Sequence, residues 1–436
     1  MFRLSSDYNE NYIGQIVKLD TPEKHNNADS LQIFYVNNHQ IITNMDYKKG
    51  DLVAFFPVGS CINKDFVKSF NGYSNPLLNV DTTIKGYFCD KARVRAISLR
   101  GSKVEGFAIP IKVLLDFLGT SEPVIPGILF DSYGDILLVE KYIIKTREKG
   151  TNLGNTNKKV SNSLRGRMIE NQFQFHIRTP ALKNNTTKIL GLSDTDVNIS
   201  ITNKIHGTSA IISNVLVESK LSWFQRLLRR CGVNIPTTEY LPVYSSRQVI
   251  KGSIDDENTK EGFYKSNVWK EVFDDIMSKR GIPKGYSIFF EIAGFTSTGE
   301  AIQGQWDYGC EPKEKKIFVY RVTNTNPDGK CIELSWNQIK QFCNDYNLQH
   351  VPELYNGKLY DFLKKHKIKS DKVLVNRLSD LYNIEGDCTM CKNKVPTEGI
   401  VLRIDDLNEF NVFKLKGHRF LIKESSLEEA TMEDEN

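Results

Sequence analysis

The sequence predicts an α+β protein of two domains, in which a small β-barrel precedes a larger domain of strands and helices. The chain of 436 residues is longer than one ordinary core, since domains usually have roughly 100–200 residues. Residues 12–110 read as short β-branched and aromatic runs, whereas after Gln172 such runs alternate with helical stretches. We expect the first domain at residues 1–125, a linker at residues 126–163 and the second domain at residues 164–436.

The N-terminal region contains five or six candidate strands. They are IGQIVKL, LQIFYV, QIITN, DLVAFFPV, KARVRAISL and GFAIPI, with a turn at KKGD before the fourth. Short strands in this number favour a small barrel over a helical bundle. Helical periodicity begins only afterwards, in IKVLLDFL.

The segment at residues 145–162 is polar, rich in Asn and Gly, and nearly free of large apolar side chains, which is typical of a linker. Beyond it, EGFYKSNVWKEVFDDIMSKRG and WNQIKQFCNDYN are expected helices in the second domain. The last thirteen residues hold six acids and no base, so we expect an acidic tail and a more basic remainder.

A further helix is expected from Ser222 to Arg230, where Ser222 can cap the start and Gly232 can end it. Its apolar side carries Trp223, Phe224 and Leu227, and its other side carries Arg226, Arg229 and Arg230. Most helices of this kind cover a core. Three arginines on one side would also suit a nucleic-acid strand.

Composition and charge narrow the class of protein. Hydrophobic residues make up 40% and charged residues 25%, the mix of a folded globular protein. The formal net charge of +5 makes phosphate-bearing partners plausible without establishing them. The polar start and the absence of an apolar run near the roughly 20 residues of a bilayer span predict a soluble, intracellular protein with no membrane partner.

Eight cysteines are spread over the chain, and a reducing compartment without disulfides is expected. Only Cys388 and Cys391 have CxxC spacing. Because a structural zinc site normally needs a second pair of ligands, the favoured interpretation is a loop with two reduced thiols. Redox or metal work is the alternative.

The stretch ITNKIHGTSA is the first with a chemical signature, because an apolar strand delivers Lys204 and then turns at Gly207. A lysine beside a glycine turn is weak evidence alone. Five further pieces follow in order, and each combines a strand with one or two charged residues: SSRQ at 245–248, IFFEIAGF at 288–295, KIFVYRV at 316–322, TEGIVLRI at 397–404 and FKLKG at 413–417.

These pieces resemble the motifs of the covalent nucleotidyltransferases, the superfamily of polynucleotide ligases and mRNA capping enzymes. The resemblance makes Lys204 in KIHG the residue that accepts the nucleotide. It also assigns Arg247 to the motif just downstream, Glu291 to the third motif, Glu398 in EGIV to the fourth, and Lys414 and Lys416 in FKLK to the fifth. The six charged residues occur in the superfamily's order.

The chemistry explains these residue types. A lysine amine attacks phosphorus only as the neutral base, and nearby cations such as Lys414 and Lys416 favour that form. The same cations stabilise charge on the phosphoryl oxygens in the transition state. Glu398 is the candidate to hold Mg²⁺ or Mn²⁺, directly or through water. By resemblance, Glu291 and Arg247 fix the ribose and the reacting ends.

Two aromatics and a histidine complete the candidate nucleotide site. In KIFVYRV, alternation places Phe318, Tyr320 and Val322 on one strand face, where a ring could stack on adenine, and the resemblance favours Tyr320. Both aromatics can instead pack in the core. His206 stands where many relatives carry an acid that organises metal-bound water, so it is either a water-orienting group at the metal or a structural histidine.

The position of the barrel selects a branch of the superfamily. Only 20 residues follow Lys416, which leaves no room there for the OB barrel that DNA ligases and capping enzymes usually carry. The pieces HNNADSLQI, KKGDLVAFFPV and RVRAISLRGSKVEGFAIP instead resemble the N-terminal OB domain of the fifth family of RNA ligases. By that resemblance the barrel grips RNA. Its candidate contacts are Arg93, Arg95, Arg100 and Lys103, although a charged outer face explains them equally well.

The resemblance implies an ATP-dependent RNA ligase, acting as a monomer in RNA repair. Lys204 attacks ATP, AMP passes to an RNA 5′-phosphate, and a 3′-hydroxyl displaces AMP, in single strands or a nicked duplex. A capping-type enzyme that transfers GMP, and a non-catalytic OB-fold RNA-binding protein, are the alternatives. Because the motif residues all follow the linker, we expect residues 164–436 alone to react with ATP.

Overall fold

The structure is a computed structural model that describes residues 1–143, 164, 166–255, 266–405 and 409–433, with only the backbone described for residues 427–433. Within these ranges the fold is mixed α and β, and its named strands pair antiparallel. We call residues 1–143 the N-terminal part and residues 164–433 the C-terminal part. No helix among the described residues has both the length and the apolar character needed to cross a bilayer.

The N-terminal part consists mainly of short strands. They are β1 (Phe2–Arg3), β2 (Gly14–Lys18), β3 (Glu23–Lys24), β4 (Leu31–Val36), β5 (His39–Asn44), β6 (Leu52–Pro57), β7 (Ser60–Ile62), β8 (Ile97–Leu99), β9 (Ser102–Val104), β10 (Gly106–Pro110), β11 (Leu129–Phe130), β12 (Ser132–Tyr133), β13 (Ile136–Leu137) and β14 (Val139–Lys141). The helices α1 (Lys64–Ser69) and α2 (Ile111–Leu118) and the 3-10 turns η1 (Glu10–Tyr12) and η2 (Pro76–Leu78) lie between them.

These strands form several small sheets. Their orders are β10-β6-β2-β11, β3-β4-β5, β1-β12-β13, β14-β7 and β8-β9, and the pairings among the described residues do not join them into one closed barrel. Of the expected strand KARVRAISL, only Ile97–Leu99 is a strand. The expected helix IKVLLDFL is present as α2.

The expected linker begins too early. Residues 129–141 form β11 to β14, and β11 pairs with β2 while β14 pairs with β7, so this stretch belongs to the N-terminal part. Phe130, Leu138 and Val139 are buried in its core, whereas the polar composition that suggested a linker belongs to residues 145–162. Residues 144–163 of the expected linker lie outside the described residues.

The C-terminal part is built on two antiparallel sheets. The strands are β15 (Asn198–Asn203), β16 (Thr208–Glu218), β17 (Thr238–Ser246), β18 (Ile250–Ser253), β19 (Tyr286–Gly294), β20 (Lys315–Thr325), β21 (Cys331–Glu333), β22 (Glu353–Lys358), β23 (Gly399–Ile404) and β24 (Asn411–Lys416). Their order is β18-β17-β16-β19-β20-β21 in the larger sheet and β22-β15-β23-β24 in the smaller one. β15 and β16 link the two sheets through the segment that contains Lys204.

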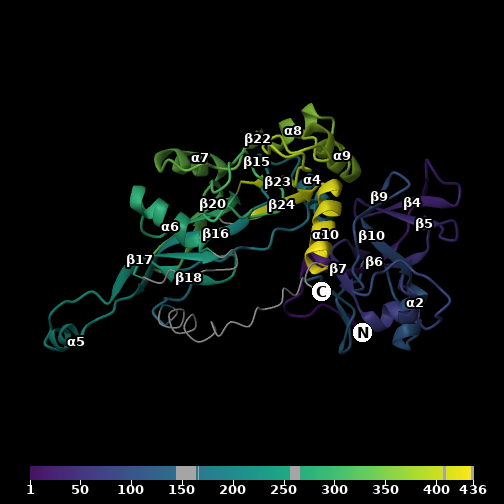
Figure 1. Ribbon diagram of the computed structural model, residues 1–436, viewed down its shortest axis with the longest axis horizontal. Helices are drawn as coiled ribbons and strands as arrows, with labels where there is room; N and C mark the ends of the chain where they lie inside the picture. Colours follow the sequence, from purple (N-terminus) through teal and green to yellow (C-terminus); the bar gives the residue numbers. More distant parts are fainter. Residues whose placement is uncertain (144–163, 165, 256–265, 406–408, 434–436) are drawn as a thin grey trace.

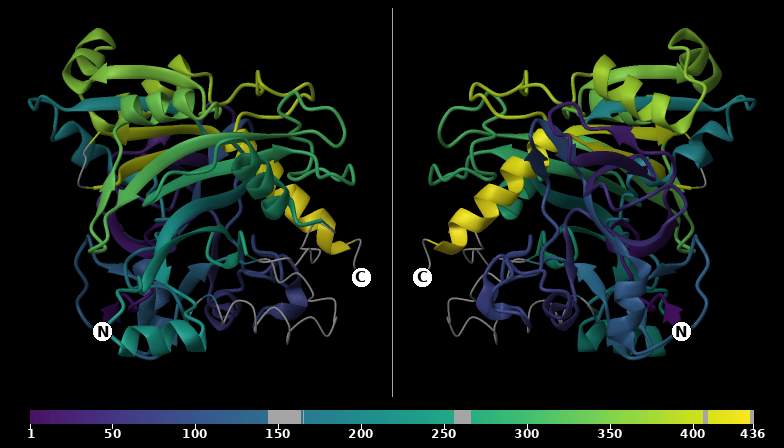
Figure 2. Two further views of the ribbon diagram at one scale, coloured as in Figure 1. Left: turned by 90° about the vertical axis from the view of Figure 1, so that its left-hand side faces the viewer. Right: turned by 90° about the vertical axis from the view of Figure 1, so that its right-hand side faces the viewer.

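The described helical segments of the C-terminal part are η3 (Leu182–Asn184), α4 (Thr186–Leu190), α5 (Trp223–Arg230), α6 (Val268–Lys279), α7 (Trp336–Asp345), α8 (Leu359–Lys365), α9 (Asp371–Leu381) and α10 (His418–Glu433). All but α5 and α10 lie against one of the two sheets (Figure 1). Apolar residues of α6 and α7 pack on the larger sheet, and those of α4, α8 and α9 on the smaller. The expected helices α5, α6 and α7 are all present. α10 follows β24 and lies beside the N-terminal part in both Figure 1 and Figure 2.

The two parts contact each other through buried polar groups. Lys183 pairs with Glu105 at 2.5 Å, and both side chains are largely buried. The Asn11 side chain donates to the carbonyl of Thr179 and accepts from the amide of Ala181. Burial would raise the pKa of Glu105, but Lys183 and His39 bring it down to about 2. Polar contacts of this kind fix the orientation of one part on the other.

Candidate active site

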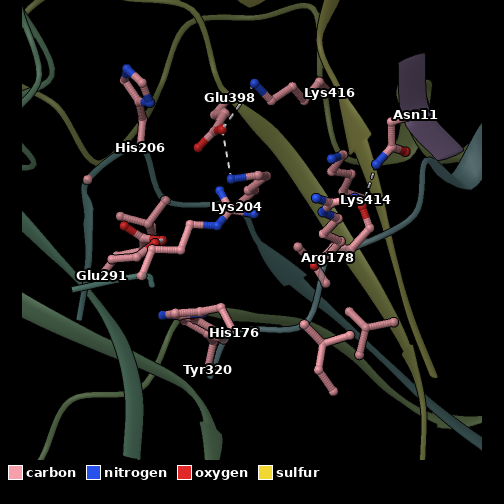
Figure 3. A pocket seen from close by; sticks show the side chains of 18 of the residues that line it. Asn11, His176, Arg178, Lys204, His206, Glu291, Tyr320, Glu398, Lys414 and Lys416 are labelled. Carbon is pink, nitrogen blue, oxygen red and sulfur yellow. Dashed lines mark hydrogen bonds and ion pairs between the residues drawn. The ribbon is translucent and has the colours of Figure 1, made fainter. Parts of the chain in front are cut away.

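A cavity of about 400 Å³ lies where the two sheets of the C-terminal part meet the N-terminal part (Figure 3). The C-terminal part supplies Lys204, Gly207, Arg247, Glu291, Tyr320, Glu398, Lys414 and Lys416, which are eight of the residues expected there. Long-range antiparallel pairing therefore brings together residues more than 200 positions apart in the chain. Sequence order alone could not establish this convergence.

Backbone contacts position Lys204 just beyond the end of β15. Its amide donates to the carbonyl of Gly399 at 2.9 Å, and the amide of His206 donates to the Tyr308 hydroxyl at 2.6 Å. A Cβ atom on Gly207 would lie 2.5 Å from the carbonyl oxygen of Ile292, so only glycine lets the loop sit against β19. The nucleophile candidate thus sits on a short segment fixed to two strands.

Lys204 faces Glu398 directly. Lys204 Nζ lies 2.7 Å from Glu398 Oε1, and Lys416 Nζ lies 3.8 Å from the same oxygen. The Glu398 side chain is 3% exposed and that of Lys204 is 24% exposed, so the lysine is the member that a ligand can reach. Figure 3 shows the three side chains pointing toward one another.

Charge keeps Glu398 ionised despite its burial. Burial would raise the pKa of this carboxyl, but the charges of Lys204 and Lys416 bring it down to about 2. Its second oxygen, Oε2, is buried and has no hydrogen-bond partner among the described residues. A buried, ionised carboxylate oxygen without a partner is a suitable ligand for a divalent cation.

The two lysines of β24 have opposite electrostatic surroundings. Burial and the neighbouring charges of Lys416 and Lys204 lower the pKa of Lys414 to about 7. Burial would also lower the pKa of Lys416, but Glu424 and Glu398 hold it above its usual value. Glu424 belongs to α10 and lies 3.1 Å from Lys416 Nζ. Lys414 can therefore take up a proton when a phosphate binds, whereas Lys416 is already protonated without a phosphate.

Glu291 lies on the opposite wall of the cavity. Its Oε1 accepts a hydrogen bond of 2.7 Å from the Ser209 hydroxyl. Burial raises the pKa of Glu291 to about 7, although Lys204 and Ser209 oppose the shift. Arg247, just beyond β17, is exposed and lines the same cavity. Glu291 thus lies in the cavity wall and Arg247 at its exposed mouth, and a nucleotide bound in the cavity could contact both.

The aromatics of β20 take different positions. Tyr320 lines the cavity, whereas Phe318 is fully buried beneath it and packs against Tyr308. A β-bulge leaves Tyr320 without a partner on β19, and Tyr320 and Arg321 both line the cavity as a result. The bulge also breaks the expected alternation, and Val322 is buried in the core and is not among the residues that line the cavity.

His206 packs among aromatic rings. Its imidazole meets the rings of Trp306 and Phe420 edge-on at 4.8 and 4.9 Å, and it points away from Lys204 in Figure 3. Burial lowers its pKa, although Glu398 and Glu424 oppose the shift. No cluster of three metal-ligating side chains occurs among the described residues. The role of His206 near a metal stays a prediction.

The expected RNA contacts in the N-terminal part are divided. Arg93 is buried, lies over the Tyr142 ring at 4.5 Å and donates to Ser425 of α10. Lys103 forms an ion pair of 2.7 Å with Glu385 of the C-terminal part. Arg95 is half-buried and Arg100 is exposed. Arg93 and Lys103 thus contact the C-terminal part, although the Lys103 side chain is still 42% exposed.

Sequence reasoning missed the other wall of the cavity. His176 contacts the Tyr320 hydroxyl at 2.7 Å, and burial with the nearby Arg247 lowers its pKa to about 3, so its ring is neutral. The N-terminal part adds Asn11, Tyr12 and Lys141 to the lining. None of these residues belongs to a charged motif on a strand, which was the only signal that the sequence offered for the site.

The side chains of the cavity indicate a class of enzyme. An accessible lysine faces a buried carboxylate, three more cations surround it, and an aromatic side chain lines the same cavity. This set suits an anionic phosphate chain with a base attached, and an amine nucleophile beside it. It is the arrangement expected of a covalent nucleotidyltransferase.

The sequence model of the RNA ligase family matches residues 197–416, which is 220 of the 436 residues and includes all six motif residues. The chain therefore belongs to the RNA ligase family, and the prediction of an RNA ligase is confirmed. No curated protein matches the chain in sequence.

Solved structures of an RNA ligase from Naegleria gruberi share the fold. A mutant with AMP and Mn has a TM-score of 0.57 at 14% identity, over 94% of this chain and 98% of that one. A mutant with ATP and Mn has a TM-score of 0.58 at 15% identity, over 95% and 99%. The enzyme with PPi has a TM-score of 0.57 at 15% identity, over 96% and 99%. The likeness covers both parts of the chain.

Proposed function

We propose that this RNA ligase uses ATP, forms a covalent lysyl-AMP intermediate on Lys204, and seals RNA 3′-hydroxyl and 5′-phosphate ends. The observation that carries the proposal is the contact of Lys204 with Glu398 and Lys416 in a cavity that also receives Arg247 and Lys414. The Naegleria gruberi enzyme of the same fold was solved with ATP, AMP and PPi, which correspond to the substrate, the transferred group and the leaving group of such a step.

In this proposal each residue has one role. Lys204 loses a proton and attacks the α-phosphorus, so that a nitrogen–phosphorus bond forms and pyrophosphate leaves. Lys414 and Lys416 bind phosphoryl oxygens and stabilise their charge in the transition state. Glu291 binds the ribose, Tyr320 stacks on the base with His176 beneath its hydroxyl, and Arg247 holds the reacting ends. Phe318 supports this wall from the core.

A divalent cation, Mn²⁺ or Mg²⁺, fits Glu398. The carboxylate is ionised and Oε2 lacks a partner among the described residues, and such cations typically use one or two carboxylates plus phosphates and water. When bound, the cation would withdraw charge from the phosphates and from the nucleophile's surroundings. Two Naegleria gruberi mutant structures with ATP also contain Mn.

We further propose that the chain belongs to the fifth family of RNA ligases. The N-terminal part, extended to Lys141 by strand pairing, is then an OB-like RNA-binding domain, and residues 164–436 are the nucleotidyltransferase domain. The short antiparallel strands before the C-terminal part support this assignment. A complete cavity within one chain supports action as a monomer.

Labelling with radioactive nucleotides tests the proposed function. The protein should become labelled by α-labelled ATP with Mn²⁺ or Mg²⁺, and GTP should label it weakly or not at all. Lys204→Ala should abolish the labelling, while Lys279→Ala, a matched change of an exposed lysine outside the cavity, should not. Labelling by GTP alone would favour the capping-type alternative, and absence of labelling by either nucleotide would favour the non-catalytic one.

A further inference from the structure

The hairpin between β16 and β17 carries an arm that the cavity does not use. The two strands pair from Ala210 with Ser246 to Glu218 with Thr238, and the arm consists of residues 219–237 between their ends. It contains α5 and projects from the body of the C-terminal part, at the left of Figure 1. No residue of α5 is buried.

Local interactions alone account for the helix in the arm. The Ser222 hydroxyl accepts from the amide of Gln225, and the Gln225 side chain accepts from the amide of Ser222, which completes a capping box. Gly232 follows with φ +87°, a conformation that favours glycine. Capping interactions within the arm thus stabilise the helix, and no packing against a core contributes. A helix that has no part in the core indicates a role on the surface.

The apolar side of α5 faces solvent. Trp223 is 77% exposed, Phe224 is 52% exposed and Leu227 is 47% exposed. Apolar side chains of this size gain roughly 1.5–3 kcal/mol each when fully buried, so a helix that displays three of them together is suited to a partner. The expectation that α5 covers a core is therefore wrong.

Charge identifies the chemistry of that partner. Residues 219–238 contain four basic side chains and no acidic one, and the four are Lys220, Arg226, Arg229 and Arg230. Arginines beside an exposed indole suit a ligand with regularly spaced phosphates and flat apolar faces, which is a nucleic-acid strand. A lipid surface fits less well, because eight helical residues with four apolar side chains, three of them exposed, form a small membrane face.

The position of the arm links it to the reaction. β16 begins at Thr208, four residues after Lys204, and extends away from the cavity. The eight residue steps from Ala210 to Glu218 span about 26 Å at roughly 3.3 Å per residue. With a spacing of about 3.4 Å per nucleotide of a strand, the arm lies roughly eight nucleotides or more from the joined ends.

We propose that the arm is a second RNA-binding site, which holds the substrate's phosphates with its arginines and stacks Trp223 on a base at a distance from the joint. The proposal rests on the proposed function, since it takes the RNA in the cavity as its reference point. It makes the length of the RNA on one side of the joint a determinant of affinity.

Substrates of different length test the arm. Nicked RNA duplexes would carry about six or about eighteen nucleotides on each side of the nick, varied independently, and binding and sealing would be measured with the full chain. For the wild type, one of the two lengthened sides should tighten binding. Arg226→Glu with Arg229→Glu and Arg230→Glu, and separately Trp223→Ala, should remove that gain, a loss of about tenfold or more, while the short substrate is unaffected.

Controls separate the arm from the cavity. Lysyl-AMP formation should be equal in the wild type and the arm variants, and Lys364→Glu with Lys365→Glu, a charge change on α8, should keep the length dependence. The proposal is overturned if the arm variants bind and seal long RNA like the wild type. It is also overturned if they lose only the binding of anionic phospholipid vesicles. Failure of the wild type to form lysyl-AMP would instead refute the proposed function.

Discussion

The two parts of this RNA ligase contribute to one cavity in different ways. The C-terminal part supplies six charged motif residues to the cavity, each at or beside a strand of its two sheets. All six could be proposed from the sequence. The N-terminal part brings Asn11, Tyr12 and Lys141, which the sequence did not single out, and Arg93, which it proposed as an RNA contact. Motifs therefore reveal the residues to which we assign the chemistry, while the wall that encloses them depends on how the two parts are docked.

This difference changes the expectation that the C-terminal part can carry out adenylation without the N-terminal part. The order of the motifs suggested that residues 164–436 alone would react with ATP. A fragment of residues 164–436 would lack the residues that the N-terminal part adds to the cavity. In that fragment Lys183, Asn184 and Arg178 would also lose their hydrogen-bond partners in the N-terminal part. We now expect the N-terminal part to support adenylation as well as RNA binding.

The largest expected effect on lysyl-AMP formation comes from changing Glu398 or Lys416, which the C-terminal part supplies to the cavity. Glu398→Gln keeps the side-chain shape but removes the charge that pairs with Lys204 and would bind the proposed divalent cation. Lys416→Met removes a charge that is proposed to contact the ATP phosphates. Each should slow lysyl-AMP formation about 10²–10³-fold, as losses of charge at transition states do. The rates would be measured in single turnovers at saturating ATP and metal. Near-normal rates in both variants would remove the basis for the motif assignment.

A smaller effect is expected at the N-terminal wall. Lys141→Met should slow lysyl-AMP formation roughly three- to tenfold, because a cation at the cavity edge is partly screened by solvent. Lys112→Met, on α2 and outside the cavity, is the matched control and should have no effect. Equal rates for Lys141→Met and Lys112→Met would show that this lysine of the wall takes no part in adenylation.

Docking of the parts should depend on one buried ion pair. Lys183→Met leaves Glu105 buried without its cation, a change that typically costs about 3–5 kcal/mol. Thermal unfolding should then begin at a lower temperature, and Lys183→Met with Glu105→Leu should recover most of the loss. If the single variant melts like the wild type, this pair does not hold the parts together.

The pH dependence of stability provides the smallest test. The folded pKa of Glu291 is about 7, above the usual 4.5, so its contribution is fully present below about pH 4.5 and is lost as the pH rises through 7. Glu291→Gln should therefore gain stability over the wild type between pH 5 and pH 8, by roughly 2–3 kcal/mol. The measurement is chemical unfolding across that range, and a constant difference would show that the pKa is unshifted.

Local sequence features predicted elements well where short-range interactions decide them. The capping box and terminal glycine of α5, and the periodicity of α2, α6 and α7, were readable because each depends on nearby residues. The bulge at Tyr320 was not, since it depends on register with β19. The strands at residues 129–141 were missed because their pairing partners, β2 and β7, lie far earlier in the chain.

The candidate site shows the same limit. Lys204, Glu398 and Lys416 could be proposed from their motifs, but their contact depends on β15, β23 and β24 lying side by side. His176 lies in a polar stretch after the linker, and only tertiary packing places it under Tyr320. The exposure of Trp223 likewise follows from the length of a hairpin that carries it beyond the sheet.

The central claim is that Lys204 carries AMP during the reaction, and peptide mapping by mass spectrometry tests it most directly. The full chain would be incubated with ATP and Mn²⁺, digested, and searched for the AMP adduct. We expect the adduct on the peptide that contains Lys204, its loss when RNA with a 5′-phosphate is added, and its absence from Lys204→Ala. An adduct on another residue, or none in the wild type under these conditions, would contradict the account.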